Sequence, residues 1–378
     1  GREGDIRVSA LPPLPFMHLA PGHDAAAIRE GIDRVIARGW FILGPELAAF
    51  EEEFASVCGA AHAVGVNTGT DAIALALRGL GIGPGDEVIT SPLSAAYSAL
   101  AIMMAGATPV FADLDADRLT LDPANVEAAV TSRTAAIVPV HLYGQAADMI
   151  AIEAIARRHK LAIVEDACQA HLATANGQPI GTIGAAGAFS FYPTKNLGAL
   201  GDAGAIITND ASLAEKVKRL RNGGQTTKYH HLEFGVNSRL DELQAAVLRA
   251  RLPLLPGWTA RRRELAARYR KGLVGAPVIV PPEKDFGHVY HLFPVRTPHR
   301  DAFQAHLREQ GVETLIHFPV PIPRQPAMAG LPASSCPVAD QVCGEVVSLP
   351  LHPALADSDV DRVIASVHDF RAKDAVGK

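Results

Sequence analysis

One lysine stands where its side chain can do covalent chemistry. Lys195 follows an alternating apolar segment at residues 188–191 and is followed by a glycine-rich loop that runs to Asp202. A desolvated lysine loses part of its preference for the charged form, and a neutral amine can attack a carbonyl carbon. A single lysine is more often a solvated surface charge. The interpretation of Lys195 as a nucleophile therefore depends on the groups that accompany it.

A carboxylate at the end of a second apolar segment is the first of these groups. Asp166 follows residues 161–165, and the carboxyl ends of strands in open α/β sheets build ligand sites. Taken alone, Asp166 is equally well explained as a helix cap. Paired with Lys195 it indicates pyridoxal phosphate, because a fixed carboxylate keeps the ring nitrogen of this cofactor protonated. Gln169 follows one helical turn later and can bond the ring hydroxyl.

A turn of small residues is the second group. Residues 67–71, which include Gly69 and Thr70, lie between the strand-like residues 63–66 and the helix-like residues 72–77. This order directs free backbone N–H groups at an anion, although the same residues would also make an ordinary helix cap. Ser190 can add a hydroxyl to the same phosphate. A phosphate cradle, a carboxylate and a lysine together predict a pyridoxal phosphate site.

The elements that must position these residues alternate along the first two thirds of the chain. Strand-like segments lie at residues 63–66, 87–90, 108–112, 136–140, 161–165, 188–191 and 204–208, and helical patterns at 72–80, 148–159 and 211–221. Such alternation predicts a mainly parallel seven-stranded sheet covered by helices, an α/β fold. The glycines at residues 79–85 follow a helix and precede a strand, the reverse of a dinucleotide fingerprint, which argues against a dehydrogenase.

The pattern changes after Arg239, where a smaller α+β domain is predicted. Helices are expected at residues 240–252 and 259–272, strands near 289–295 and 312–316, and a last helix at 359–370. The predicted division is a loose N-terminal arm at 1–15, a large α/β domain at 16–252 and a C-terminal domain at 253–378.

Composition excludes several classes of protein. The chain has 378 residues, 48% of them hydrophobic, and a formal charge of −5, which supports a folded core and gives no basic surface for nucleic acid. Its four cysteines show no C-x-x-C pair and no zinc-ligand spacing, so we expect no metal and reduced thiols in a cytoplasmic protein. Neither a signal peptide nor a membrane-spanning segment is expected.

From about residue 41 to residue 353 the chain resembles the DegT-type nucleotide-sugar aminotransferases, which are fold type I enzymes dependent on pyridoxal phosphate. The segments that carry the resemblance are residues 65–72, 139–145, 165–171, 190–198, 229–231 and 235–244. The resemblance implies that Lys195 forms the Schiff base with the cofactor and later acts as the general base. It implies roles in cofactor binding for Gly69, Thr70, Asp166, Gln169, Ser190 and Asn237. Asn237 would reach the phosphate from the neighbouring subunit, which implies a homodimer with shared active sites.

The resemblance also suggests a substrate. The lysine loop at residues 193–202 and the segment 228–231 are similar to those of enzymes that aminate C3 of dTDP-linked sugars. We therefore predict transfer from L-glutamate to a dTDP-3-keto-6-deoxyhexose. The candidate substrate contacts are Lys228, Tyr229, His230, His231, His317 and Arg324. A polar surface hairpin and a proline-rich turn are the structural alternatives for these two segments.

Other outcomes on the same scaffold remain open. They are a C4 aminotransferase acting on a dTDP-, UDP- or GDP-linked 4-keto sugar, a sugar dehydratase, and a catalytically silent regulatory or binding relative. Dehydratases of this fold carry histidine in place of the lysine, and a silent relative has no need of both Lys195 and Asp166.

Two positions depart from the pattern of the family. Ala95 replaces the residue that often covers the cofactor ring, and Tyr97, two residues on, is expected to point to a different helix face. Leu172 replaces a residue that is often glycine and is expected to narrow the sugar pocket.

Overall fold

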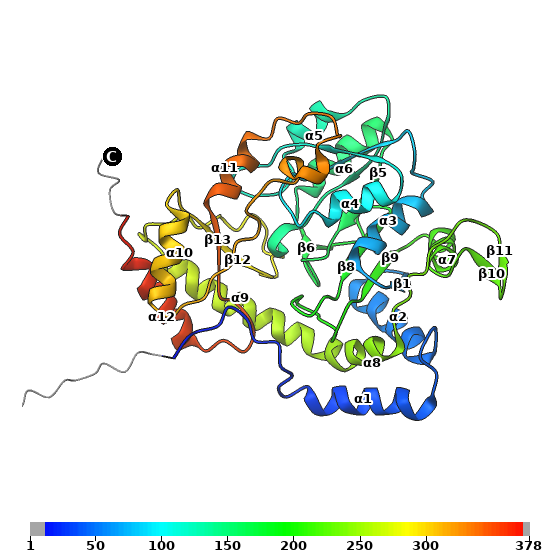
Figure 1. Cartoon of the computed structure of the whole chain (residues 1–378), viewed down its shortest axis with the longest axis horizontal. Helices are drawn as coiled ribbons and strands as arrows, with labels where there is room; N and C mark the ends of the chain where they lie inside the picture. The colour runs from blue at the N-terminus through cyan, green and yellow to red at the C-terminus, as the bar shows by residue number, and fades with distance from the viewer. Residues whose placement is uncertain (1–11, 373–378) are drawn as a thin grey trace, which may run out of the picture.

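The computed structural model of the protein describes residues 12–372, and its centre is a seven-stranded sheet. The strand order is β1-β9-β8-β5-β4-β2-β3 (Figure 1). The strands are β1 (His62–Val66), β2 (Glu87–Thr90), β3 (Thr108–Phe111), β4 (Thr134–Val138), β5 (Ala162–Asp166), β8 (Ala186–Ser190) and β9 (Gly204–Thr208). The strand β9 runs antiparallel to the other six strands of this sheet, which are parallel to one another. The predicted mainly parallel seven-stranded α/β sheet is confirmed.

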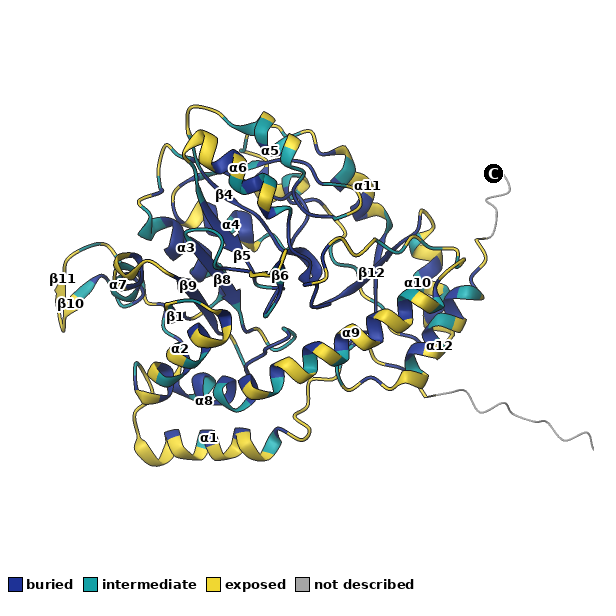
Figure 2. Cartoon of the chain, turned by 180° about the vertical axis from the view of Figure 1, so that it is seen from behind, coloured by how far each residue is buried: buried dark blue, intermediate teal, exposed yellow. Residues whose placement is uncertain are grey.

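Helices cover both faces of this sheet because side chains of successive strand residues point to opposite faces. Val64 and Ile206 belong to the core beneath α3 (Gly69–Gly79), α4 (Tyr97–Met104) and α7 (Ala211–Leu220). Their neighbours Ala63 and Ile207 belong to the opposite core, beneath α2 (Pro45–Cys58), α5 (Pro123–Ala129), α6 (Met149–His159) and α8 (Glu242–Arg251). The strands are buried almost throughout, as Figure 2 shows.

The C-terminal part has a core of its own. The long helix α9 (Leu255–Gly272) packs against α12 (Asp357–His368) and leads to the strand pair β12 (Phe293–Arg296) and β13 (Val346–Leu349). Two more helices, α10 (Arg300–Glu309) and α11 (Pro337–Glu345), complete this part. Tyr269, Phe293 and Phe303 are fully buried in its core. The boundaries of two separate domains remain a prediction.

Two predicted strands of this part were placed wrongly. Residues 312–316 form only isolated bridges, because Val312 pairs with Leu14 whereas Leu315 pairs with Ser348, and no continuous ladder forms. The expected strand at 289–295 begins only at Phe293. Before it, Val289 and Leu292 donate backbone hydrogen bonds to the turn at residues 142–144, at 3.0 and 3.3 Å.

The N-terminal segment runs along both parts of the molecule. Of the predicted loose arm, residues 1–11 lie outside the described residues, and Leu14 is buried in the C-terminal core. The backbone N–H of Leu14 donates to the carbonyl of Gly311 at 2.8 Å. Helix α1 (Ala25–Arg38) then packs along α8 (Figure 1). The end of the predicted arm is therefore packed against the C-terminal part.

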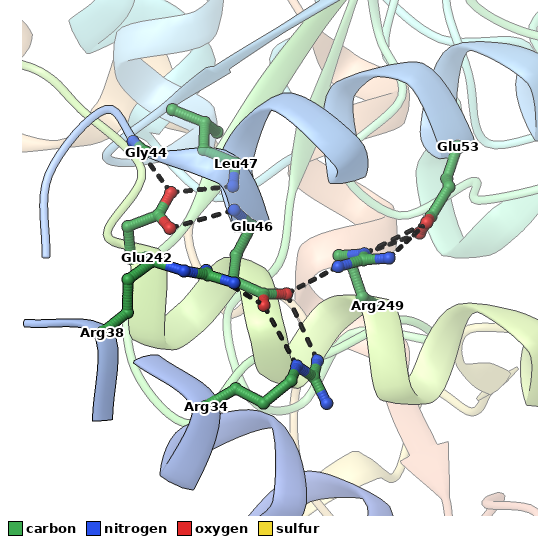
Figure 3. A network of polar contacts seen from close by, with 8 residues as sticks. All are labelled: Arg34, Arg38, Gly44, Glu46, Leu47, Glu53, Glu242 and Arg249. Carbon is green, nitrogen blue, oxygen red and sulfur yellow. Dashed lines mark hydrogen bonds and ion pairs between the residues drawn. The ribbon is translucent and has the colours of Figure 1, made fainter. Parts of the chain in front are cut away.

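A buried carboxylate joins α8 to the start of α2. Glu242 accepts hydrogen bonds from the backbone N–H groups of Gly44, Glu46 and Leu47 at 3.0, 2.9 and 2.8 Å (Figure 3). These are N–H groups that the first turn of a helix leaves without intrahelical acceptors. The side chain of Glu46 in turn pairs with Arg34 of α1 and Arg249 of α8 at 3.2 and 2.7 Å. The three helices are thereby held as one unit.

Within residues 12–372, no helix combines the length and the apolar character that crossing a membrane requires. All four cysteines are free thiols, and three of them are buried.

Candidate active site

The carboxyl ends of β1, β5 and β8 meet at one edge of the sheet and border a cavity of about 610 Å³. Parallel strands bring the residues that follow them to the same edge. Seven of the residues predicted from the sequence line this cavity: Gly69, Thr70, Asp166, Gln169, Ser190, Lys195 and His317. Residues that are far apart in the chain are thus brought to one site.

Lys195 is held at the start of a tight loop beyond β8. Its backbone N–H donates to the carbonyl of Tyr192 at 2.8 Å. At Gly198, three residues on, a Cβ would lie only 2.5 Å from the carbonyl oxygen of Pro193, so the loop requires glycine there. Burial lowers the pKa of Lys195 below its usual value, and Cys168 and Asp166 partly oppose this shift. A lowered pKa favours the neutral amine that nucleophilic attack requires.

Asp166 ends β5 with both carboxylate oxygens held. The hydroxyl of Ser98 donates to Oδ2 at 2.6 Å, and the backbone N–H of Cys168 donates to Oδ1 at 3.1 Å. The side chain is buried and can only accept hydrogen bonds while ionised. A carboxylate oriented in this way can accept a hydrogen bond from a protonated ring nitrogen in the cavity.

Gln169 is oriented by the turn at residues 142–144. Its Oε1 accepts a hydrogen bond from the backbone N–H of Tyr143 at 2.8 Å. Because an amide carries one oxygen and one NH₂ group, this bond leaves the Nε2 donors for the cavity. The side chain is suited to donate to a ring hydroxyl or phenolate oxygen.

The N-terminus of α3 forms the cradle that the sequence predicted for an anion. Thr68 caps this helix by accepting a hydrogen bond from the N–H of Asp71 at 3.0 Å. The N–H groups of Gly69 and Thr70 have no acceptor within residues 12–372, and helix N-termini of this kind bind phosphate. A Cβ at Gly69 would lie 2.8 Å from Cβ of Ser190, so glycine allows the helix to approach β8 closely.

These donors and acceptors fit pyridoxal phosphate. The helix N-terminus suits a phosphate, Asp166 a pyridinium nitrogen, Gln169 a ring oxygen and Lys195 an aldehyde carbon. The described residues 12–372 hold no group of three or more side chains suited to a metal ion.

The residues predicted to contact the substrate across a subunit interface do not line the cavity of their own chain. Lys228 and Tyr229 lie at the turn of the hairpin of β10 (Gln225–Thr227) and β11 (His230–His231), which projects from the body (Figures 1 and 2). Tyr229 is 82% exposed. The imidazole Nδ1 atoms of His230 and His231 bond to Thr226 Oγ1 at 2.9 Å and to the Gly223 carbonyl at 2.7 Å. Asn237 is also exposed and outside the cavity.

Of the two candidate substrate contacts in the proline-rich segment, only one borders the cavity. His317 lines the cavity, with Nδ1 at 2.9 Å from Ser348 Oγ, and burial together with the charge of Lys195 lowers its pKa to about 4. Arg324 lies outside the cavity and pairs with Asp340 at 2.9 Å. Within its own chain, Arg324 is therefore paired with Asp340 and does not border the cavity, and its contact with substrate stays a prediction.

Two expectations about cavity shape were wrong. Tyr97 lines the cavity together with Ala95, because α4 begins only at Tyr97 and the argument from helix faces does not apply before it. Leu172 does not line the cavity. It packs against the core around α2 and α6, with a left-handed φ of 65°.

Sequence reasoning missed Ser98, Cys168, Tyr192 and His291, which also line the cavity. Ser98 follows the carboxyl end of β2, and this position was a usable signal. His291 carried no such signal, since it comes from the C-terminal part. Its Nδ1 lies 3.1 Å from Oδ1 of Asn196, the neighbour of Lys195.

The sheet, together with a lysine, an aspartate and a helix N-terminus at its carboxyl edge, is the architecture of a fold type I aminotransferase. The chain belongs to the DegT/DnrJ/EryC1/StrS aminotransferase family, whose model matches residues 23–368. This membership confirms the resemblance seen in the sequence and the prediction of an aminotransferase.

Three similar proteins illustrate the range of the family. The dTDP-3-amino-3,4,6-trideoxy-alpha-D-glucose transaminase of Streptomyces venezuelae is 50% identical over 365 residues, covering 95% of this chain and 96% of that protein. A protein named pleiotropic regulatory protein, from Geobacillus stearothermophilus, is 46% identical over 365 residues, covering 94% of this chain and 98% of that protein. The crystal structure of S. venezuelae DesV in complex with a ketimine intermediate matches with a TM-score of 0.91 at 50% identity, covering 95% of this chain and 98% of that chain.

Proposed function

We propose that the protein is a pyridoxal-phosphate-dependent aminotransferase that moves an amino group from L-glutamate to C3 of a dTDP-3-keto-6-deoxyhexose. The product would be a dTDP-3-amino-3,6-dideoxyhexose. The observation that carries the chemistry is the pair formed by Lys195, with its lowered pKa, and Asp166, held by Ser98. The name of the S. venezuelae relative supports the C3 position and the dTDP-linked sugar.

Pyridoxal phosphate bound in this cavity would supply an electron sink that makes the carbon bearing the amino group acidic. Lys195 Nζ would take the proton from that carbon of the amino donor and pass it to the cofactor, and in the second half-reaction it would carry a proton from the cofactor to the sugar carbon. Asp166 would accept the hydrogen bond of the ring N–H and stabilise its positive charge. Gln169 Nε2 would donate to the ring oxygen, and the N–H groups of Gly69 and Thr70 would hold the phosphate with Ser190.

We further propose that two copies of the chain complete one another's sites. Asn237 and residues 228–231 are exposed and lie outside the cavity of their own chain. Trp40, Phe41 and Phe234 expose 54%, 48% and 87% of their surface, which is unusual for large apolar side chains and suggests an interface. Lys228 and Tyr229 would then contact the substrate in the site of the partner.

Complementation tests this arrangement. A Lys195→Ala variant and an Asn237→Asp variant, each inactive alone, are mixed under conditions that exchange subunits. Shared sites predict recovery of activity, because the mixed dimer contains one site with both native residues. Two variants that remain inactive in a mixture shown to contain mixed dimers contradict the shared site.

The substrate is tested with the enzyme in its pyridoxamine form, freed of excess amino donor. The enzyme receives dTDP-3-keto- or dTDP-4-keto-6-deoxyglucose, and the return of the visible cofactor absorbance is followed. Return with the 3-keto sugar alone is expected. Return with the 4-keto sugar alone would establish the C4 alternative, and return with neither would direct the search to UDP- or GDP-linked sugars.

The regulatory alternative is motivated by the name of the G. stearothermophilus relative. Lys195 and Asp166 are both present and oriented in this chain, whereas a protein that only binds has no use for a lysine with a lowered pKa. Loss of the visible absorbance on addition of L-glutamate to the wild-type protein, and no loss with Lys195→Ala, are expected. A wild-type protein that binds the cofactor and never reacts with an amino acid would support regulation.

A further inference from the structure

A second cavity of about 380 Å³ lies against the other side of the lysine loop. Its walls come mainly from residues 17–20 and 22–24, residues 193–196, the α9 residues Trp258, Arg261 and Arg262, and residues 352–354, with Gly198 and Arg251. Thr194 and Lys195 border both this cavity and the cofactor cavity. Nothing in the proposed cofactor chemistry uses this second space.

Arg262 is a buried cation in its wall that has no carboxylate partner within residues 12–372. The side chain is 4% exposed, and its Nη1 donates to the carbonyls of Tyr290, His291 and Leu351 at 3.1, 3.2 and 3.1 Å. Its buried Nε has no acceptor among the described residues. Burial lowers the pKa of Arg262 to about 10, so it remains charged at neutral pH. A buried charge without a counterion is costly, and such charges are usually paired or functional.

Three of the other charged side chains at this cavity already have partners. Asp24, which lines it, pairs with Arg251 at 2.8 Å. The neighbouring Arg261 pairs with Asp357 at 2.8 Å. The remaining titratable groups of the lining, His18, His23, Lys195 and His352, are not anions. The described side chains therefore leave the positive charge of Arg262 unbalanced at this cavity, and an anion from outside the chain would balance it.

His352 adds a second unpartnered polar group. It lines the same cavity, is 7% exposed, and its buried Nδ1 has no partner among the described residues. Burial and the nearby Arg262 lower its pKa to about 4, so the ring is neutral at pH 7. A neutral imidazole can donate one hydrogen bond. One cation and one neutral donor match a single carboxylate better than a diphosphate, which carries more negative charge.

Arg262 is connected to the reactive lysine by a short chain of contacts. Its Nη1 donates to the carbonyl of His291, whose ring Nδ1 lies 3.1 Å from Oδ1 of Asn196, the residue after Lys195. An anion bound at Arg262 therefore lies beside the loop that carries the nucleophile. Of the substrates in the proposed reaction, the amino acid is the one with carboxylates.

We propose that this cavity binds a carboxylate of the amino donor through Arg262 and His352. The proposal rests on the proposed aminotransferase function and extends it, by assigning the amino acid a binding site distinct from the sugar contacts. For L-glutamate the carboxylate is the distal one, since the α-carbon must remain at Lys195.

Equilibrium binding tests the site without catalysis. Glutarate, a dicarboxylate without an amino group, is titrated calorimetrically into the cofactor-loaded wild-type protein, Arg262→Gln and His352→Phe. We expect glutarate affinity to fall at least tenfold in both variants, since each loses a donor to the carboxylate. Arg268→Gln is the matched control, because this side chain lies on the same helix, pairs with Asp361 at 2.7 Å and does not border the cavity, so the affinity of this variant should equal that of the wild type. Equal glutarate affinity in all four proteins, or no binding to the wild type, would overturn the proposal.

The two half-reactions separate a binding defect from a folding defect. Arg262→Gln and His352→Phe should need at least tenfold more L-glutamate to reach half the maximal rate of amination, while their reaction with the keto sugar keeps its wild-type rate. Equal losses in both half-reactions of both variants would overturn the proposal. If wild-type enzyme accepts the keto sugar but does not react with L-glutamate, the donor in the proposed function is wrong. The glutarate titrations still decide whether the cavity binds a carboxylate.

Discussion

Gly69 is tightly packed in the candidate site, and this packing gives a quantitative prediction for Gly69→Ala. The new Cβ would lie 2.7 Å from Cys168 Sγ and 2.8 Å from Ser190 Cβ. Overpacking of this kind costs roughly 1–3 kcal/mol, of which alanine returns up to about 1 kcal/mol through its higher helix propensity. We therefore expect the apoprotein to lose about 0–3 kcal/mol of stability.

The larger effect of Gly69→Ala should fall on the cofactor. The clash is relieved when the N-terminus of α3 moves away from β8, which shifts the N–H groups of Gly69 and Thr70 relative to Ser190. A hydrogen bond to a charged group contributes about 1.5–3 kcal/mol, so the loss of one such bond weakens pyridoxal phosphate binding by roughly 10- to 100-fold. Titration of the apoprotein, followed by visible absorbance, measures this change.

Gly257→Ala is the matched control for this experiment. Gly257 lies in α9 with nothing within 4 Å of its added Cβ. This variant should keep wild-type cofactor affinity and gain roughly 0.4–1 kcal/mol of stability. If Gly69→Ala binds the cofactor as tightly as Gly257→Ala does, the close approach of α3 to β8 is not what forms the phosphate cradle.

Three further predictions test other contacts. Ser98→Ala should lower kcat about tenfold or more while cofactor binding persists, because Asp166 loses its 2.6 Å hydrogen bond; unchanged kcat would contradict this. Burial lowers the pKa of His171 from 6.5 to about 3, so between these values the unfolded chain takes up a proton that the folded protein does not. The free energy of unfolding should therefore fall as pH falls through this range, and His171→Gln, measured by urea denaturation, should reduce the slope by up to about 1.4 kcal/mol per pH unit. Glu242→Gln should lower the free energy of unfolding by roughly 1–3 kcal/mol and lower Tm, because an amide NH₂ would face backbone N–H groups. Glu215→Gln on the surface is the control and should change the free energy of unfolding by less than about 0.5 kcal/mol.

Most of the candidate cofactor site could be predicted from the sequence for a topological reason. Asp166, Ser190 and Gly69 each stand at or just after the carboxyl end of a strand, and three mutually parallel strands bring those ends together. Local composition is enough to identify such strand ends. His291 was missed because its partner, Asn196, is 95 residues away in the chain. Ser98 is 68 residues from Asp166, and its place after β2 was the one signal that could have identified it.

The strands of the C-terminal part show why the remaining elements were harder to place. Residues 312–316 have strand-like composition, but their hydrogen bonds go to two different partners, Leu14 and Ser348. Composition records a preference for extended backbone, whereas a strand also needs a neighbour that continues alongside it. That neighbour is determined by long-range packing.

The sequence by itself determined the alternation of strands and helices, the sheet they form, and the identity of the lysine, carboxylate and glycine turn that define the family. Periodicity and local backbone preference suffice for these because they act between residues close in the chain. The tertiary structure alone decided which hydrogen bonds orient Asp166 and Gln169. It also decided that Arg324 is paired, whereas Arg262 is buried without a carboxylate partner among the residues that the structure describes. Charge balance and desolvation depend on every group that packs around a side chain, and those neighbours come from all parts of the fold.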